Sequence, residues 1–137
     1  MIDNHAIPII DLFAGPGGLG EGFMQIADRR GRRAFRIALS IEMDQFAHRT
    51  LTLRSFFRQF PIGDVPDDYY RYVRGDRSVP TQEALFERHA AAGEAASREA
   101  WRATLGVTPA SEVSSRVSAA LKGRRKSDPW VLIGGPP

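Results

Sequence analysis

The N-terminal part of the chain switches between a strand pattern and a helix pattern. Residues 7–13 form a nearly continuous apolar run, broken only by Pro8 and Asp11, which predicts a buried parallel strand with its proline at the entry. Residues 19–27 carry apolar side chains at helical spacing. They predict a helix that packs on the sheet, with Gly31 as its C-terminal stop.

A second strand and a second helix are expected next. The alternating side-chain pattern of residues 36–41 predicts a strand. Glu42 falls at the carboxyl end of this strand, where open parallel sheets bind their ligands. Residues 45–60 predict a helix whose apolar stripe repeats with a four-three spacing. The side chains of this stripe are Phe46, Thr50, Leu53, Phe57 and Phe60. The order strand, turn, helix, strand, helix predicts an α/β fold.

The rest of the chain predicts a helical insertion over about residues 65–127. Turn residues and an aromatic cluster make residues 61–72 an irregular section, while the stretch 81–104 is rich in Ala, Glu and Arg. That stretch predicts one or two helices, with an interruption at Gly93. A shorter helix, a basic turn and a last short strand are expected over residues 112–121, 123–128 and 130–133.

Composition narrows the class of protein. A length of 137 residues suffices for one domain with one core. No apolar run approaches the roughly 20 residues that span a bilayer, so we expect a cytoplasmic protein without a membrane partner. The chain has no cysteine, and His5, His48 and His89 show no metal-ligand spacing, so we expect no metal. A net charge of +3 and a pI near 9.8 permit a nucleic-acid partner.

A glycine-rich turn lies between the first strand and the first helix. Its glycines let the backbone turn sharply and approach a ligand without Cβ clashes. No lysine follows them, which disfavours a loop that cradles β- and γ-phosphates. Gly15, Gly17 and Gly20 also satisfy the dinucleotide fingerprint, so a nicotinamide or flavin is an alternative to the cofactor considered next.

Three segments together resemble the DNA cytosine-5 methyltransferase family: Asp-Leu-Phe-Ala-Gly-Pro-Gly-Gly at residues 11–18, Ile-Glu-Met-Asp at 41–44 and Gly-Gly-Pro-Pro at 134–137. The resemblance implies a Rossmann-like S-adenosylmethionine-dependent methyltransferase fold, here incomplete. Residues 1–137 would form the N-terminal part of its cofactor-binding catalytic domain. The implied cofactor is S-adenosylmethionine, and the implied contacts are Phe13, Gly15, Gly17, Gly18, Glu42, Met43 and Asp64.

The implied contacts have separate roles, and some have plain structural alternatives. Glu42 is expected to bind the ribose hydroxyls, and Phe13 to pack on the cofactor unless it is a core residue. Met43 is expected either to lie against the adenine ring or to fill a helix interface. Asp64 lies in a Gly-Asp-Val sequence that matches the family segment whose carboxylate binds the adenine amino group. Asp44 is expected to cap the second helix rather than touch ligand.

Buried and basic residues give further expectations. Asp11 lies inside an apolar strand, so we expect it to hydrogen-bond to loop amides. Arginines around residues 29–36 are expected to form a solvated surface. A second basic group is placed either to meet DNA phosphates or to be solvated, and consists of Arg116, Lys122, Arg124, Arg125 and Lys126.

In the family, the catalytic cysteine follows the Gly-Gly-Pro-Pro segment directly. Here Pro136 and Pro137 are the last residues, so they would stiffen the nucleophile loop while the nucleophile itself would follow Pro137. We therefore expect the chain alone to be inactive and the complete enzyme to methylate C5 of cytosine in DNA, in restriction-modification or defence. A second polypeptide could carry the remaining motifs. The alternatives are a non-catalytic module that binds cofactor or a partner, and a fragment of a dinucleotide-binding oxidoreductase.

Overall fold

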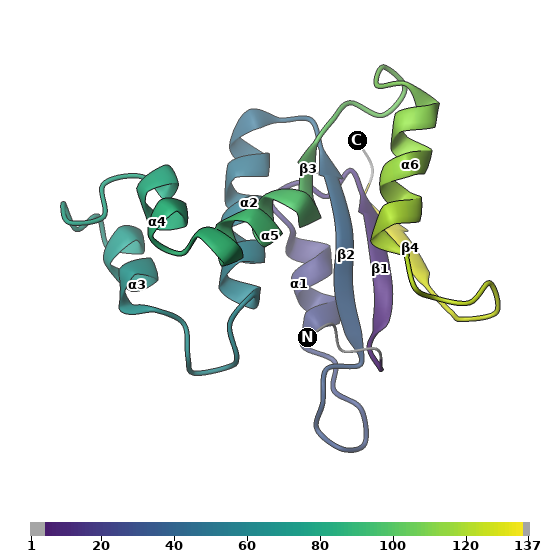
Figure 1. Ribbon diagram of the computed structural model, residues 1–137, viewed down its shortest axis with the longest axis horizontal. Coiled ribbons are helices and arrows are strands. Elements are labelled where there is room, and N and C mark those ends of the chain that lie inside the picture. Colours follow the sequence, from purple (N-terminus) through teal and green to yellow (C-terminus); the bar gives the residue numbers. More distant parts are fainter. Residues whose placement is uncertain (1–4, 136–137) are drawn as a thin grey trace.

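Four parallel strands form the central sheet of the computed structural model, which describes residues 5–135 (Figure 1). The strands are β1 (Ile7–Leu12), β2 (Phe35–Glu42), β3 (Ala100–Arg102) and β4 (Val131–Gly134). They lie in the order β3-β2-β1-β4, and every neighbouring pair is parallel. This α/β arrangement, with strand order reversing beside β1, is compatible with a Rossmann-like fold.

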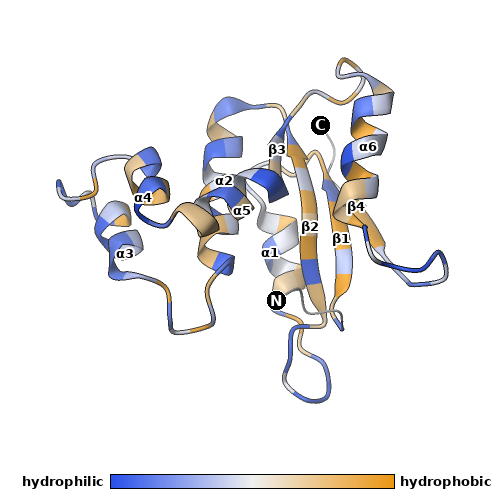
Figure 2. Cartoon of the chain, in the orientation of Figure 1, coloured by the Kyte–Doolittle hydropathy of each residue, from blue (hydrophilic) through white to orange (hydrophobic). Residues whose placement is uncertain are grey.

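Helices cover both faces of the sheet. Alternate side chains of β1 point to opposite faces, so Ile9 packs with Met24 of α1 (Gly18–Met24), whereas Ile10 packs on the side of α6 (Ala110–Ala120). A register shift between Ile9 and Ile10 marks an irregularity in the β1–β2 pairing. Figure 2 shows apolar residues concentrated along β1 and β2 and hydrophilic ones on the loop before β4.

Three helices extend from one side of the sheet, as Figure 1 shows. They are α3 (Asp67–Val73), α4 (Gln82–Arg88) and α5 (Ala90–Glu99), and they pack against α2 (Gln45–Arg58). Phe56 of α2 is fully buried among them, and its ring stacks on Phe86 at 4.9 Å between centroids. Val79 and Leu85 are also almost completely buried there. We call this group the aromatic cluster.

The first helix is shorter than the pattern predicts. It ends at Met24, and Gly31 lies in the following connection rather than at the helix end. After the helix the chain turns back before β2: Ala27 bridges Arg33, and the Asp28 carboxylate accepts hydrogen bonds from the backbone N–H of Arg30 and Arg32. The predicted Gly31 stop is therefore wrong.

The stretch 81–104 is not wholly helical. Its helices break at His89, where φ is −126°, while Gly93 lies inside α5 with Phe86 directly against it. The chain then becomes extended as β3 and pairs with β2, so this segment completes the sheet as well as adding helices. Residues 67–73, expected to be irregular, form α3.

The second helix buries a different face from the predicted stripe. Its buried residues are Leu51, Thr52, Ser55 and Phe56, whereas Phe46 is 77% exposed. Because the sheet and the aromatic cluster both contact α2, its buried face is broader and includes polar Thr52 and Ser55. No helix among the described residues is long and apolar enough to cross a membrane.

Candidate functional site

The loop between β1 and α1 has an unusual backbone. Phe13, which follows β1, adopts φ +53°, a left-handed conformation that is strained for a residue with a side chain. Gly17 has φ +93° and precedes the first residue of α1. This conformation favours glycine, and a Cβ on Gly17 would also lie 2.9 Å from a terminal methyl of Leu51 of α2, which would have to move. We call residues 13–18 the glycine loop.

Backbone and side-chain hydrogen bonds hold the glycine loop in place. Ala14 N–H donates to the carbonyl of Ile41 at 3.0 Å, and Gly17 N–H donates to the carbonyl of Ala14 at 3.0 Å. From α2, Arg54 donates to the carbonyl of Pro16 at 2.9 Å. The loop is therefore fixed to both β2 and α2.

Glu42 joins the glycine loop to the end of β2. Its Oε2 accepts from Gly15 N–H at 2.6 Å, and its Oε1 accepts from Asp44 N–H at 2.9 Å. Each carboxylate oxygen has a second lone pair, and Glu42 is only partly buried. The carboxylate can therefore hold the loop and still accept hydrogen bonds from a ligand hydroxyl.

The surroundings of Glu42 fit an adenosine-containing cofactor. A Cβ built on Gly15 or Gly18 meets nothing within 4 Å, so there is open space beside the loop. Phe13 begins the loop and Met43 follows Glu42, and their side chains are 42% and 62% exposed, more than a core residue would be. Such a group would be held by the Glu42 carboxylate, by these two apolar side chains and by the backbone of Gly15, Gly17 and Gly18.

Asp44 is the N-cap of α2, as predicted. Its Oδ1 accepts from the N–H groups of Phe46 and Ala47 at 3.0 and 2.8 Å. Capping satisfies two helix donors and fixes the start of α2 next to Glu42. Arg102, at the end of β3, donates to the Met43 carbonyl at 3.3 Å and so also supports this turn.

Asp11 departs from the expectation. It is 1% exposed, but neither carboxylate oxygen has a hydrogen-bond partner among the described residues, so the predicted bonds to loop amides are absent. The β1 pleat turns the side chain towards α1, where a Cβ on Gly20 would lie 3.3 Å from Asp11 Oδ2. Burial raises the Asp11 pKa to about 6, with Arg58 lowering and Glu42 raising it.

Arg58 was missed by the sequence analysis. Its side chain is 8% exposed and lies between two carboxylates, bonding Glu21 of α1 and, at 2.5 Å, Glu99 of α5. Arg54 and Arg58 are four residues apart on α2, so they share a face. That spacing was the available signal that α2 directs arginines towards the glycine loop and α1.

The remaining predicted residues do not all lie beside the glycine loop and Glu42. Asp64 follows the C-terminal end of α2, opposite to the end that begins beside Glu42, and is exposed. Gly134 does lie beside β1, where a Cβ would be 2.8 Å from the Leu12 carbonyl oxygen. Pro136 and Pro137 lie outside the described residues. Across residues 5–135 no cluster of three or more His, Cys, Asp or Glu is placed to hold a metal.

Most of the basic residues lie away from the glycine loop. The connection 25–34 enters β2 and the connection 121–130 enters β4, so both are at the amino edge of the parallel sheet, opposite Glu42. Arg116 of α6 differs, because its guanidinium lies 4.7 Å from the ring of Trp101, which pairs with Ile41 next to Glu42. Contact of the second group with DNA phosphates stays a prediction.

The chain is similar to a known methyltransferase. The chain is 26% identical over 140 residues, covering 94% of the chain, to the Type II methyltransferase M.Bpa9945I of Bacillus paralicheniformis. It spans about 30% of that relative's length. No family model and no solved structure matches the chain. Because the match covers nearly the whole chain, it supports a methyltransferase relationship.

Proposed function

We propose that the chain binds S-adenosylmethionine at the glycine loop and Glu42, as the cofactor-binding part of a DNA cytosine-5 methyltransferase. The hydrogen bond from Gly15 N–H to Glu42 Oε2, 2.6 Å long, carries this proposal. It joins the turn after β1 and the tip of β2 into one polar site. A carboxylate at this place in a parallel sheet can bind ribose hydroxyls.

The cofactor supplies an electrophilic methyl group on its sulfonium. Glu42 would hold the ribose, Phe13 and Met43 would contact the apolar parts of the cofactor, and the amides of the glycine loop would meet its polar atoms. The relative is a Type II methyltransferase, which agrees with this cofactor. Asp64 is left out, because it follows the far end of α2.

The cytosine-5 assignment is the finer part of the proposal. It is supported by the Gly-Gly-Pro-Pro segment at residues 134–137, whose first glycine lies against the end of β1. In this chemistry a thiolate attacks C6 of a flipped cytosine, C5 then takes the methyl group, and loss of the C5 proton releases the thiolate. The chain has no cysteine, so the nucleophile and the DNA-reading residues would come from a following segment or a second polypeptide.

A dinucleotide is the second candidate ligand. The observation in its favour is Gly20, where a Cβ would lie 3.1 Å from Ile37, because the third fingerprint glycine permits close packing of helix and strand. Glu42 would then bind the ribose of NAD. The two ligands are separated by asking which one, S-adenosylhomocysteine or NAD, raises the melting temperature of the chain.

Calorimetric titration of the 137-residue chain with S-adenosylhomocysteine tests the proposal. Glu42→Ala should weaken binding roughly ten- to a hundredfold, because charge-assisted hydrogen bonds contribute about 1.5 to 3 kcal/mol. Glu42→Gln keeps an acceptor for Gly15 N–H, so its affinity should lie between those of wild type and Glu42→Ala. Glu112→Ala removes an exposed glutamate from α6 and is the matched control.

Two outcomes would count against the proposal. One is equal affinity for wild type and Glu42→Ala with both variants folded by circular dichroism. The other is stabilisation by NAD and none by S-adenosylhomocysteine. Asp64→Ala belongs in the same series, and a loss of affinity there would restore Asp64 to the cofactor site.

A further inference from the structure

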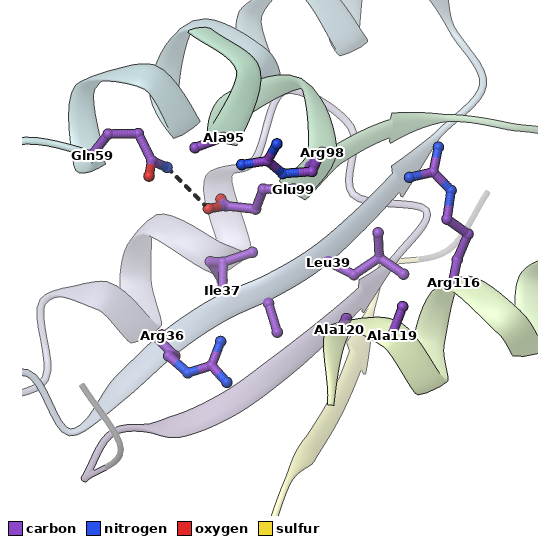
Figure 3. Close-up of a pocket in the computed structure, with 11 residues that line it drawn as sticks. Arg36, Ile37, Leu39, Gln59, Ala95, Arg98, Glu99, Arg116, Ala119 and Ala120 are labelled. Carbon is purple, nitrogen blue, oxygen red and sulfur yellow. Dashed lines mark hydrogen bonds between the residues drawn. The ribbon is translucent and has the colours of Figure 1, made fainter. Parts of the chain in front are cut away.

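A cavity of about 320 Å³ lies over β2 between α5 and α6 (Figure 3). Its floor is apolar, made by Ala38 and Leu39 of β2, and Ala119 and Ala120 of α6 form a wall of small side chains. A cavity of this size is sufficient for a small organic ligand.

Guanidinium groups surround this apolar floor. Figure 3 shows Arg36 on β2, Arg98 on α5 and Arg116 on α6 at separate positions around the cavity. A further arginine, Arg124, is close enough to Arg36 to perturb its ionisation. The rim therefore presents positive charge from several elements that are distant in sequence.

The carboxylate of Glu99 also lines the cavity, but its hydrogen bonds go to other side chains. Its Oε1 accepts from Arg58 at 2.5 Å, and its Oε2 accepts from Gln59 at 3.4 Å. Glu99 attracts Arg36 without forming a hydrogen bond to it. Arg98 also pairs with Glu94 of α5 at 3.9 Å, so two carboxylates, one of them shared with Arg58, face the three arginines that line the cavity. A net positive charge remains there.

Within residues 5–135, two buried arginine donors lack acceptors, and the one on Arg36 lines the cavity. Arg124 does not line it and donates from Nη2 to the Pro129 carbonyl at 3.2 Å. The Nε atoms of Arg36 and Arg124 are buried, and neither has a hydrogen-bond partner among the described residues. Burial lowers the pKa of Arg36, and the charge of Arg124 lowers it further, while Glu99 raises it. Buried donors without acceptors, next to a like charge, are costly unless an anion joins them.

The cavity is separate from the candidate cofactor site. Arg36 lies near the amino end of β2 and Glu42 at its carboxyl end, about 20 Å apart at the usual rise of a strand. The glycine loop contributes none of its lining. Binding here can therefore be tested independently of S-adenosylmethionine.

We propose that this cavity binds a small phosphate ester, with the phosphate at the Arg36 guanidinium and the less polar part on the floor at Ala38 and Leu39. A phosphate accepts several charge-assisted hydrogen bonds and matches the planar fork of a guanidinium. It would supply an acceptor to the buried Nε of Arg36 and offset the repulsion between Arg36 and Arg124. Arg98 and Arg116 add positive potential at the rim.

Phenyl phosphate and inorganic phosphate are suitable probes, titrated by calorimetry at constant ionic strength. Wild type should bind phenyl phosphate saturably and more tightly than inorganic phosphate, because only the ester covers the apolar floor. Arg36→Gln should weaken phenyl phosphate about tenfold or more. Arg98→Gln, at an exposed position of α5, should weaken it about threefold.

Arg30→Gln is the matched control, since Arg30 is exposed in the connection before β2 and does not line the cavity. It should leave the affinity unchanged. The proposal is overturned if wild type shows no saturable binding of either probe, or if Arg36→Gln and Arg98→Gln both bind like wild type. Since Arg98 is on the surface, that variant keeps the test decisive if Arg36→Gln fails to fold.

Discussion

Helix α2 is contacted by two regions whose contacts differ in kind. The glycine loop is fixed mainly by hydrogen bonds, from Arg54 of α2 to the Pro16 carbonyl and from Gly15 N–H to Glu42 of β2, with a small apolar contact at Leu51. Helices α3 and α4 are attached through the aromatic cluster around Phe56 and Leu85. Polar contacts fix particular atoms and need particular residues, whereas apolar packing accepts many side chains of suitable volume. The first region therefore carries a recognisable motif and the second does not.

The largest expected effect is on the apolar side of this comparison. Leu85→Ala removes a fully buried side chain from the aromatic cluster and should lower the free energy of unfolding by about 2 to 5 kcal/mol. Urea unfolding followed by circular dichroism measures this. The loss should be the same at every pH, because no proton is involved.

The cofactor affinity of Leu85→Ala tests whether the two regions act independently. At a temperature where Leu85→Ala remains folded, its affinity for S-adenosylhomocysteine should equal that of wild type. A large drop in affinity would mean that the two regions are coupled through α2 and do not act independently.

A smaller effect, which depends on pH, is expected on the polar side. The folded-state pKa of Asp11 is about 6, against an ordinary value of 3.8, since the carboxyl is buried. Well below pH 3.8 both states are protonated, so the ionisation of Asp11 contributes nothing to the free energy of unfolding. As pH rises to about 6 the unfolded state releases its proton first, so stability falls, by an amount on the order of 2 to 3 kcal/mol.

Asp11→Asn removes this titration. The difference in unfolding free energy between the variant and wild type should increase between about pH 4 and pH 6 in favour of the variant, and then level off. Urea unfolding of both proteins at each pH unit gives the difference directly. A difference that stays constant across this range would show that Asp11 does not titrate as its burial implies.

The sequence predicted the polar region well because its residues are constrained one by one. β1, β2 and β4 and the start of α2 lie within a residue or two of the predicted bounds, and Asp44 caps α2 as expected. Glu42 falls at the tip of β2, beside the glycine loop. Turn glycines, helix caps and strand ends each depend on local chemistry that a single sequence displays.

The apolar region was predicted less well for a physical reason. β3 has only the residues Ala100–Arg102, and its preceding run of Ala, Glu and Arg favours a helix, so pairing with β2 decides its conformation. On the polar side, Asp11 was expected to have hydrogen-bond partners, but the described residues offer none, and the structure places it against Gly20, a neighbour in space that sequence order does not reveal. Which face of α2 is buried likewise depends on the elements that pack against the helix.

The most direct test of the central claim is to map the cofactor site by nuclear magnetic resonance. S-adenosylhomocysteine is titrated into the ¹⁵N-labelled chain and backbone amide shifts are followed. The account predicts the largest changes at Gly15, Gly17 and Met43, with little change at Val79 and Leu85. Changes concentrated in α3 and α4 or around Arg36, or no saturable change at all, would contradict it.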